Sequence, residues 1–368
     1  MTTSTRRVLP LACLLILPVL ASAGEPAHLA ATQLPSGPVL CLPVSGDALL
    51  HQRLDLDLAA GANILAYPFG RLEVALDALE VQPVSPATGL TLSEVSLAPD
   101  ARDTAVWQLT ADKACHATLQ LRHPLKGLEW RLEYAVTFSR DARTCSVAAN
   151  LVVTNRSKLV FDNVVLRLPG GQQLQTALAQ NETFQKQLFV AEKVACEPMT
   201  VYDTARYGAA VAAVVRLPRT GDDPFSAGLL TAGKVRFYSG DDTHSYLGED
   251  NLPLVAPHER VDLKVGVVPE ITATRKVAKT SQLDVKTDIR DKLALYNQED
   301  DIEVELRNQR KTPVSLILRD KLDGDWSLLR PSVPGTRLDA DVVEFAISLE
   351  PGEVRKVTYT VRRANQQP

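Results

Sequence analysis

The chain has 368 residues, of which 45% are hydrophobic and 23% are charged. This is the composition of an ordinary globular protein, and it excludes a disordered, a collagen-like or a disulfide-dense chain. The 40 Lys and Arg residues against 44 Asp and Glu residues give a formal net charge of −4. Non-specific binding of nucleic acid needs clustered cations that displace counterions, so we expect no nucleic-acid partner.

The N-terminus has the layout of a secretory signal peptide. Arg6 and Arg7 precede a 13-residue apolar run from Val8 to Leu20, and Ala21-Ser22-Ala23 forms a small-residue cleavage site. The run is shorter than the roughly 20 residues that span a bilayer, and no later stretch is long and apolar enough. We therefore expect residues 1–23 to be removed and the mature chain, without a transmembrane segment, to be periplasmic or secreted.

Apolar and polar side chains alternate along most of the mature chain, which predicts β-strands with one buried face. Residues 117–121, 130–138 and 147–153 form one such series, and the turns between them predict an antiparallel meander. Residues 234–238 and 244–248 predict a hairpin around an Asp-rich turn. Residues 174–195 contain helix formers without a 3.6-residue stripe, so we expect at most a short helix there.

The C-terminal part repeats the strand pattern at short intervals. Residues 302–306, 314–318, 343–347 and 357–361 alternate, and turn sequences join them. Four or more short strands within about 100 residues predict an immunoglobulin-like sandwich. The fold class is therefore all-β, with an antiparallel β-sandwich domain over residues 24–257 followed by an immunoglobulin-like domain over residues 258–368. The charged stretch 280–297 is an alternative boundary.

Four cysteines remain after removal of the signal peptide: Cys41, Cys115, Cys145 and Cys196. In an exported chain they predict up to two disulfides with three connectivities, whereas buried free thiols are the alternative. In the predicted meander, Cys115 and Cys145 would lie two strand spacings apart, about 10 Å. A disulfide needs Cα atoms about 5.5 Å apart, so this pair would require another strand order or pairing across two sheets.

The common catalytic motifs G-x-S-x-G, H-E-x-x-H and G-x-G-x-x-G are absent from the sequence, and we predict no catalytic residue, cofactor or metal. The segment from residue 240 to 250 is the strongest candidate for a ligand site. Its interpretations are a simple hairpin turn, a hard-cation site built from carboxylates, or a glycoside hydrolase site with two facing carboxyl groups. The candidate residues are Asp241, Asp242, His244, Glu249 and Asp250.

Three stretches carry a family resemblance. Trp130 to Gly171 contains W-x-x-x-Y, an alternating strand and a Leu-rich strand that ends in Pro-Gly-Gly. Ala232 to Gly266 contains A-G-K-V-R-F-Y and L-G-E-D, and Val304 to Glu353 contains V-E-L-R-N, L-R-D-K-L and L-E-P-G-E. The order of these three stretches resembles that in the bacterial family called domain of unknown function 4139, or mucoidy-inhibitor-like. The chain resembles a short variant of this family, without a coiled coil. The resemblance implies an all-β fold and assigns no catalytic residue.

These observations predict an exported protein of the bacterial envelope that is non-catalytic and binds or scaffolds another protein or a surface glycan. One alternative is a hydrolase of envelope polysaccharide that uses the acidic residues of segment 241–250. Another is a periplasmic chaperone-like module, which would need an exposed hydrophobic edge strand and a basic pair for a client carboxylate.

Overall fold

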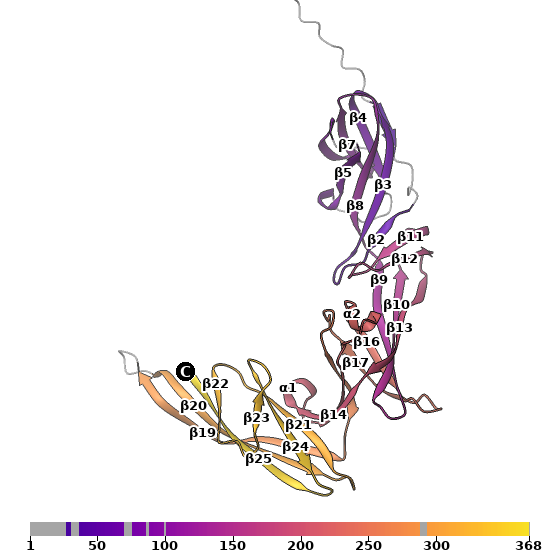
Figure 1. Ribbon diagram of the computed structural model, residues 1–368. Coiled ribbons are helices and arrows are strands. Elements are labelled where there is room, and N and C mark those ends of the chain that lie inside the picture. The colour runs from indigo at the N-terminus through magenta and orange to yellow at the C-terminus, as the bar shows by residue number, and fades with distance from the viewer. Residues whose placement is uncertain are drawn as a thin grey trace, which may run out of the picture. The chain divides into compact units, whose positions relative to one another are not determined.

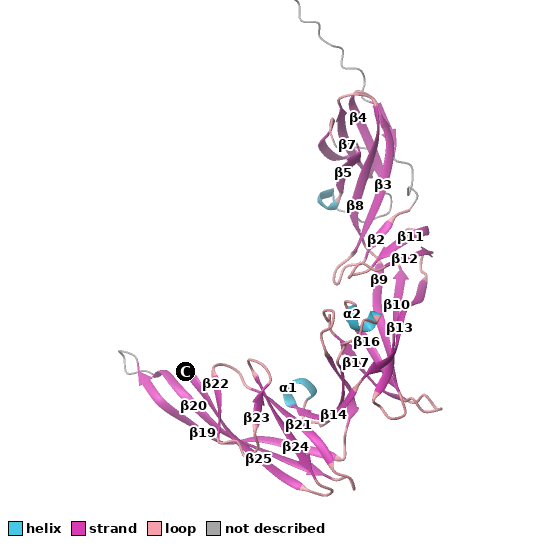
Figure 2. Cartoon of the chain, in the orientation of Figure 1, coloured by secondary structure: helices cyan, strands magenta, loops and turns pink. Residues whose placement is uncertain are grey.

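A computed structural model describes residues 27–30, 37–69, 76–85, 88–98, 101–287 and 293–367. Of the described residues, 66% are in strands and 3% in helices, which confirms the all-β prediction (Figures 1 and 2). The predicted signal peptide lies outside the described residues. The chain divides into two compact units, one formed by the residues up to 38 with residues 51–124 and the other by residues 39–50 with residues 125–368.

The first unit is a sandwich of two β-layers. One layer has the order β1-β4-β7-β6, and the other contains β3, β8 and β5 in that order. Leu65 and Trp107 of the first layer pack with Leu54 and Leu119 of the second in one buried cluster. The strands are β1 (Ala27–Ala30), β3 (Ala48–Leu58), β4 (Gly61–Pro68), β5 (Glu80–Ser85), β6 (Leu90–Ala98), β7 (Ala101–Ala111) and β8 (Cys115–Leu125), with the 3-10 helix η1 (Leu76–Ala78) before β5.

The second unit begins with a five-stranded sheet of order β13-β10-β9-β16-β17. Its strands are β9 (Leu128–Phe138), β10 (Thr144–Asn155), β13 (Thr183–Ala195), β16 (Gly233–Tyr238) and β17 (Tyr246–Leu252). The β9–β10 pair and the β16–β17 hairpin are antiparallel, as predicted. The predicted meander is wrong at its first strand, because β8 lies beside β3 and β5 while the parallel strand β16 takes the second side of β9.

The region predicted to hold at most a short helix is two strands. β12 (Gln173–Leu178) pairs with β11 (Phe161–Arg167), which in turn pairs in parallel with β2 (Val39–Cys41). β13 pairs along most of its length with β10. Pairing with long neighbouring strands therefore outweighs the local helix propensity of these residues.

The remaining strands of the second unit form a sandwich of two sheets, ordered β18-β15-β14-β21-β24-β23 and β19-β20-β25-β22. Leu318 and Phe345 of one sheet pack with Val304 and Tyr359 of the other. The strands are β14 (Glu197–Asp203), β15 (Ala212–Leu217), β18 (Val261–Val267), β19 (Ile271–Thr287), β20 (Leu293–Asn308), β21 (Val314–Lys321), β22 (Trp326–Leu329), β23 (Gly335–Arg337), β24 (Val342–Leu349) and β25 (Val354–Gln366).

The predicted domain boundary at residues 257 and 258 falls inside this second unit. β14 and β15 come before it in the chain, yet β14 pairs in parallel with β21 from after it. Two single-turn helices, α1 (Thr204–Tyr207) and α2 (Pro224–Ala227), connect strands of this part of the chain. The alternation that predicted the four C-terminal strands is confirmed in β20, β21, β24 and β25.

Candidate functional site

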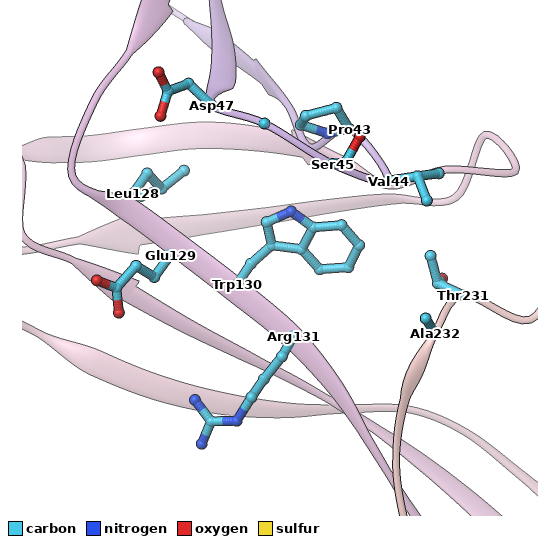
Figure 3. Close-up of a pocket in the computed structure, with 11 residues that line it drawn as sticks. Pro43, Val44, Ser45, Asp47, Leu128, Glu129, Trp130, Arg131, Thr231 and Ala232 are labelled. Carbon is cyan, nitrogen blue, oxygen red and sulfur yellow. The ribbon is translucent and has the colours of Figure 1, made fainter. Parts of the chain in front are cut away.

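A pocket of about 390 Å³ lies in the second unit at the start of β9 (Figure 3). This volume is within the range of small-molecule sites, about 300–1,000 Å³. Three segments line it: the β2–β3 loop, the first residues of β9, and the residues before β16. The lining residues are Pro43, Val44, Ser45, Gly46, Asp47, Leu128, Glu129, Trp130, Arg131, Thr231 and Ala232.

The indole of Trp130 lies in the middle of this pocket. Trp130 has the same parity on β9 as Leu132 and Tyr134, which are buried. Leu128, two residues nearer the end of the strand on the same face, is buried as well. The Trp130 indole is nevertheless only half-buried, and it extends between the Pro43–Val44 loop and Thr231 (Figure 3). Among the interactions of the described residues, its N–H group makes no hydrogen bond. An aromatic face and a free donor are thus both offered to a ligand.

The wall that carries Thr231 and Ala232 is held against β9 by two contacts. The Tyr134 hydroxyl donates a hydrogen bond of 2.8 Å to the Thr231 carbonyl oxygen. Gly233 follows, and a Cβ atom on it would lie only 2.3 Å from the Leu132 carbonyl oxygen. Glycine therefore permits the close parallel approach of β16 to β9, which fixes the distance between this wall and Trp130.

Arg219 stabilises the segment that precedes the pocket wall at Thr231. Only 1% of its surface is exposed. Its guanidinium donates to the carbonyl oxygens of Phe225, Gly228, Ala256 and Glu259 at distances of 2.5 to 3.1 Å. A buried guanidinium needs its donors satisfied, and backbone carbonyls here take the place of a carboxylate. The segments at 225–228 and 256–259 are thereby joined, and Leu230 and Val255 form an isolated β-bridge beside them.

The charged residues that line the pocket point in different directions. Arg131 extends away from the indole and pairs with Glu133 at 2.9 Å (Figure 3). Glu129 pairs with Arg156 at 3.5 Å. Asp47, in the β2–β3 loop, has no ion-pair or hydrogen-bond partner among the described residues. The groups available to a ligand are therefore the Trp130 indole, the Asp47 carboxylate and the backbone of the loop.

The sequence-predicted ligand segment forms the β16–β17 hairpin rather than a cleft. Asp241 caps the turn, accepting hydrogen bonds from the hydroxyls of Ser239 and Thr243 at 2.7 and 2.6 Å. These bonds, that of Thr243 first, lower the pKa of Asp241 to about 2. Asp242 is 93% exposed and pairs with Arg140, and His244 has a φ of 44° in the same turn. Asp241 therefore stabilises the turn, and Asp242 and His244 are part of it.

Glu249 and Asp250 lie on β17 and have structural partners of their own. Glu249 accepts from Lys234 at 2.8 Å and lies 3.8 Å from Arg236, which also bonds Glu133. The hydrogen bond from Lys234 is the main cause that lowers the pKa of Glu249. Asp250 accepts from the backbone N–H of Lys264 at 2.7 Å. Glu249 is thus one member of a row of ion pairs across three strands.

This arrangement does not supply the chemistry of a glycosidase or a cation site. A general acid needs a raised pKa, whereas the pKa values of Asp241 and Glu249 are lowered. Within the described ranges, no three His, Cys, Asp or Glu side chains converge so that they could hold a metal ion. The hairpin interpretation is therefore the one that the geometry favours for residues 241–250.

The four cysteines are unpaired in the structure. Cys41 and Cys115 are half-buried, whereas Cys145 and Cys196 are buried. Cys115 lies on β8 of the first unit and Cys145 on β10 of the second. The predicted disulfides stay a prediction, and the strand neighbours of each cysteine are now defined.

Sequence reasoning placed Trp130 in a strand but did not identify it as a ligand-binding residue. The only local signal was its position near the start of a strand, shortly after the Pro124–Gly127 turn. No family model, no curated protein and no solved structure matches this chain. In the part of the chain that the structure describes, no helix has the length and apolar character needed to cross a membrane.

Proposed function

We propose that this protein is an exported, non-catalytic binding module of the bacterial envelope, and that the Trp130 pocket takes a saccharide ring of an envelope glycan. The half-exposed indole of Trp130, positioned in a pocket between two fixed walls, is the single observation that carries the proposal. The proposal deepens the expectation of a protein or glycan partner by committing to the glycan.

The chemistry of the pocket suits a sugar better than an apolar ligand. The face of an aromatic ring is electronegative, so it attracts the polarised C–H groups on one side of a pyranose ring. The unpartnered Asp47 carboxylate and the indole N–H can then bond hydroxyl groups at the edge of the sugar.

The alternative functions have less support. The hydrolase alternative depends on residues 241–250, whose carboxylates are engaged in a turn and in ion pairs with lowered pKa values. The chaperone-like alternative depends on an exposed hydrophobic edge strand beside a basic pair. No observation on the described residues favours either of them over the Trp130 pocket.

The test measures retention of the mature chain, residues 24–368, by two probes: insoluble peptidoglycan in a sedimentation assay and soluble exopolysaccharide in affinity electrophoresis. We expect at least one glycan to bind. We expect Trp130→Ala to weaken that binding about two- to twelvefold, since an aromatic contact contributes about 0.5–1.5 kcal/mol. Trp130→Phe keeps an aromatic face and should retain most of the affinity.

Tyr246→Ala is the matched control, because Tyr246 is an aromatic residue with 55% exposure that does not line the pocket. It should bind as the unaltered chain does. Absence of binding to both glycans, or equal losses in the Trp130 and Tyr246 variants, would contradict the proposal. Trp130-dependent binding of a proline-rich peptide instead would assign the pocket to a protein partner.

A further inference from the structure

Cys145 and Cys196 lie on neighbouring strands at a place where the chain leaves one sheet for another. Cys145 is the second residue of β10 and stands opposite Val194 of β13. Cys196 is the single residue between β13 and β14, and its backbone N–H donates to the Arg143 carbonyl oxygen at 3.0 Å. The two cysteines are thus diagonal neighbours across an antiparallel pair.

Both side chains point to the same side of this pair. Val194 and Cys196 are buried while Ala195 between them is exposed, and Cys145 opposite is buried as well. The two thiols are close enough to influence each other's pKa, and the Cys196 thiol donates a hydrogen bond of 3.1 Å to the Ala142 carbonyl oxygen. Diagonal neighbours on one face have Cα atoms about 7–8 Å apart, so a local backbone shift of about 1–2 Å would bring this pair to disulfide geometry.

We propose that Cys145 and Cys196 form an intrachain disulfide in the exported protein, which selects one pairing among those that the sequence left open. The inference is independent of the Trp130 pocket. It concerns the junction between β13, which belongs to the five-stranded sheet, and β14, which belongs to the next. The bond would tie this junction to β10 and so fix the point at which the chain changes sheets.

The reaction is a thiol–disulfide exchange. The two thiols lose two protons and two electrons, and a sulfur–sulfur bond forms between Cys145 and Cys196. The electrons pass through a mixed disulfide to the disulfide bond of an oxidant, which is released as a dithiol. In an oxidising export compartment that oxidant is a disulfide-carrying protein, and in the test tube it is oxidised glutathione.

Burial determines when this reaction takes place. It raises the pKa of both thiols, and the neighbouring sulfur raises that of Cys145 further. Because the thiolate is the attacking species, the folded dithiol reacts slowly. We therefore expect oxidation during folding, before β10 and β13 close over the sulfur atoms, and slow oxidation of a chain that has already folded in reduced form.

Peptide mapping tests the proposal directly. The full-length chain is exported with its own signal sequence and quenched in acid; its free thiols are then alkylated under denaturing conditions, and it is digested with trypsin without reduction. Trypsin places Cys145 in the peptide of residues 144–156 and Cys196 in that of residues 194–206. We expect these two peptides to be recovered as one linked species, lighter than their sum by two hydrogen atoms, and to separate after reduction.

A second arm makes the result independent of export in the chosen host. The mature chain, purified reduced, is unfolded and refolded with a mixture of oxidised and reduced glutathione, and it should yield the same linked species. The double variant Cys41→Ser/Cys115→Ser should still yield it. Recovery of both peptides in alkylated form after both treatments, or linkage of either one to Cys41 or Cys115, would overturn the proposal.

Discussion

The hydroxyl of Tyr134, in the middle of β9, donates a hydrogen bond to the carbonyl oxygen of Thr231, a residue that precedes β16 and lines the pocket. The two residues are 97 positions apart in the chain. Trp130 lies on the same strand as Tyr134, so this bond and the close approach of Gly233 to Leu132 together set the distance between the indole and the opposite wall. The pocket therefore depends on a long-range contact rather than on a local motif.

Replacing Tyr134 by Phe should loosen this wall. The substitution keeps the ring but leaves the Thr231 carbonyl without its donor, and an unsatisfied buried acceptor costs about 1–3 kcal/mol. We expect the urea midpoint of unfolding to fall and glycan binding to weaken. Tyr246→Phe, at a position 55% exposed, should change neither; equal losses in the two variants would show that the buried bond is unimportant.

Gly233→Ala should be strongly unfavourable, because the new Cβ would lie 2.3 Å from the Leu132 carbonyl oxygen and 3.0 Å from the Tyr134 ring. The backbone of β16 must then move away from β9, which disrupts the parallel pairing of these strands. We expect a lower thermal unfolding temperature and loss of the binding that depends on Trp130. Gly266→Ala is the control, because the nearest atom to its Cβ position, the Leu247 carbonyl oxygen, is 3.8 Å away.

Arg219→Met should destabilise the second unit. The variant fills a similar space but leaves the four carbonyl groups that Arg219 bonds without donors. At about 1 kcal/mol or more for each lost partner, we expect a decrease of about 3 kcal/mol or more in the free energy of unfolding. Arg140→Met, at an arginine whose side chain is 73% exposed, should cost less than about 1 kcal/mol, and a similar cost at both positions would contradict this view.

Asp262 should contribute a pH dependence to stability. Burial alone would raise its pKa, but hydrogen bonds and charge from Arg216, with further charge from Arg319, hold the pKa of Asp262 below its ordinary value. A lowered folded-state pKa means that the stabilisation is present above the unfolded-state value, near 4, and is lost as pH falls through the folded-state value. Stability should therefore decrease on the acid side of pH 4.

Urea unfolding of the unaltered chain and of Asp262→Asn, measured from pH 6 to pH 2, checks this prediction. The variant should be less stable at pH 6, and its stability should depend less on pH below 4. Asp242→Asn is the control, since the Asp242 side chain is 93% exposed. Parallel curves for the unaltered chain and Asp262→Asn would show that this carboxylate is not the source of the dependence.

Alternation along the sequence predicted a minority of the strands that the structure describes, among them β9, β10, β16 and β17. The pair of β9 and β10 and the hairpin of β16 and β17 were predicted correctly from period-two patterns and turn residues. The pattern could not show that β8 leaves β9 and pairs with β3 instead. It also could not show that residues 183–195 form the strand β13, because that strand is stabilised by its pairing with β10.

The candidate site was harder to predict than the fold. The acidic residues of segment 241–250 were predicted as a ligand site because their carboxylates are close together in sequence. On the hairpin, these carboxylates accept hydrogen bonds within the turn and form ion pairs between strands. Trp130 drew none, because its alternation with Leu132 predicts a core residue. The exposure of a side chain on a strand depends on the neighbouring strands and loops, which a local sequence pattern does not specify.

The sequence by itself determined that this chain is built from strands, and it defined which side chains of each strand share a face, because both follow from local sterics and from the two-residue repeat of a pleated backbone. The tertiary structure alone decided which strands became neighbours, which aromatic side chain remained half-buried in a pocket, and which two cysteines became diagonal neighbours on adjacent strands. Each of these depends on packing between segments far apart in the chain.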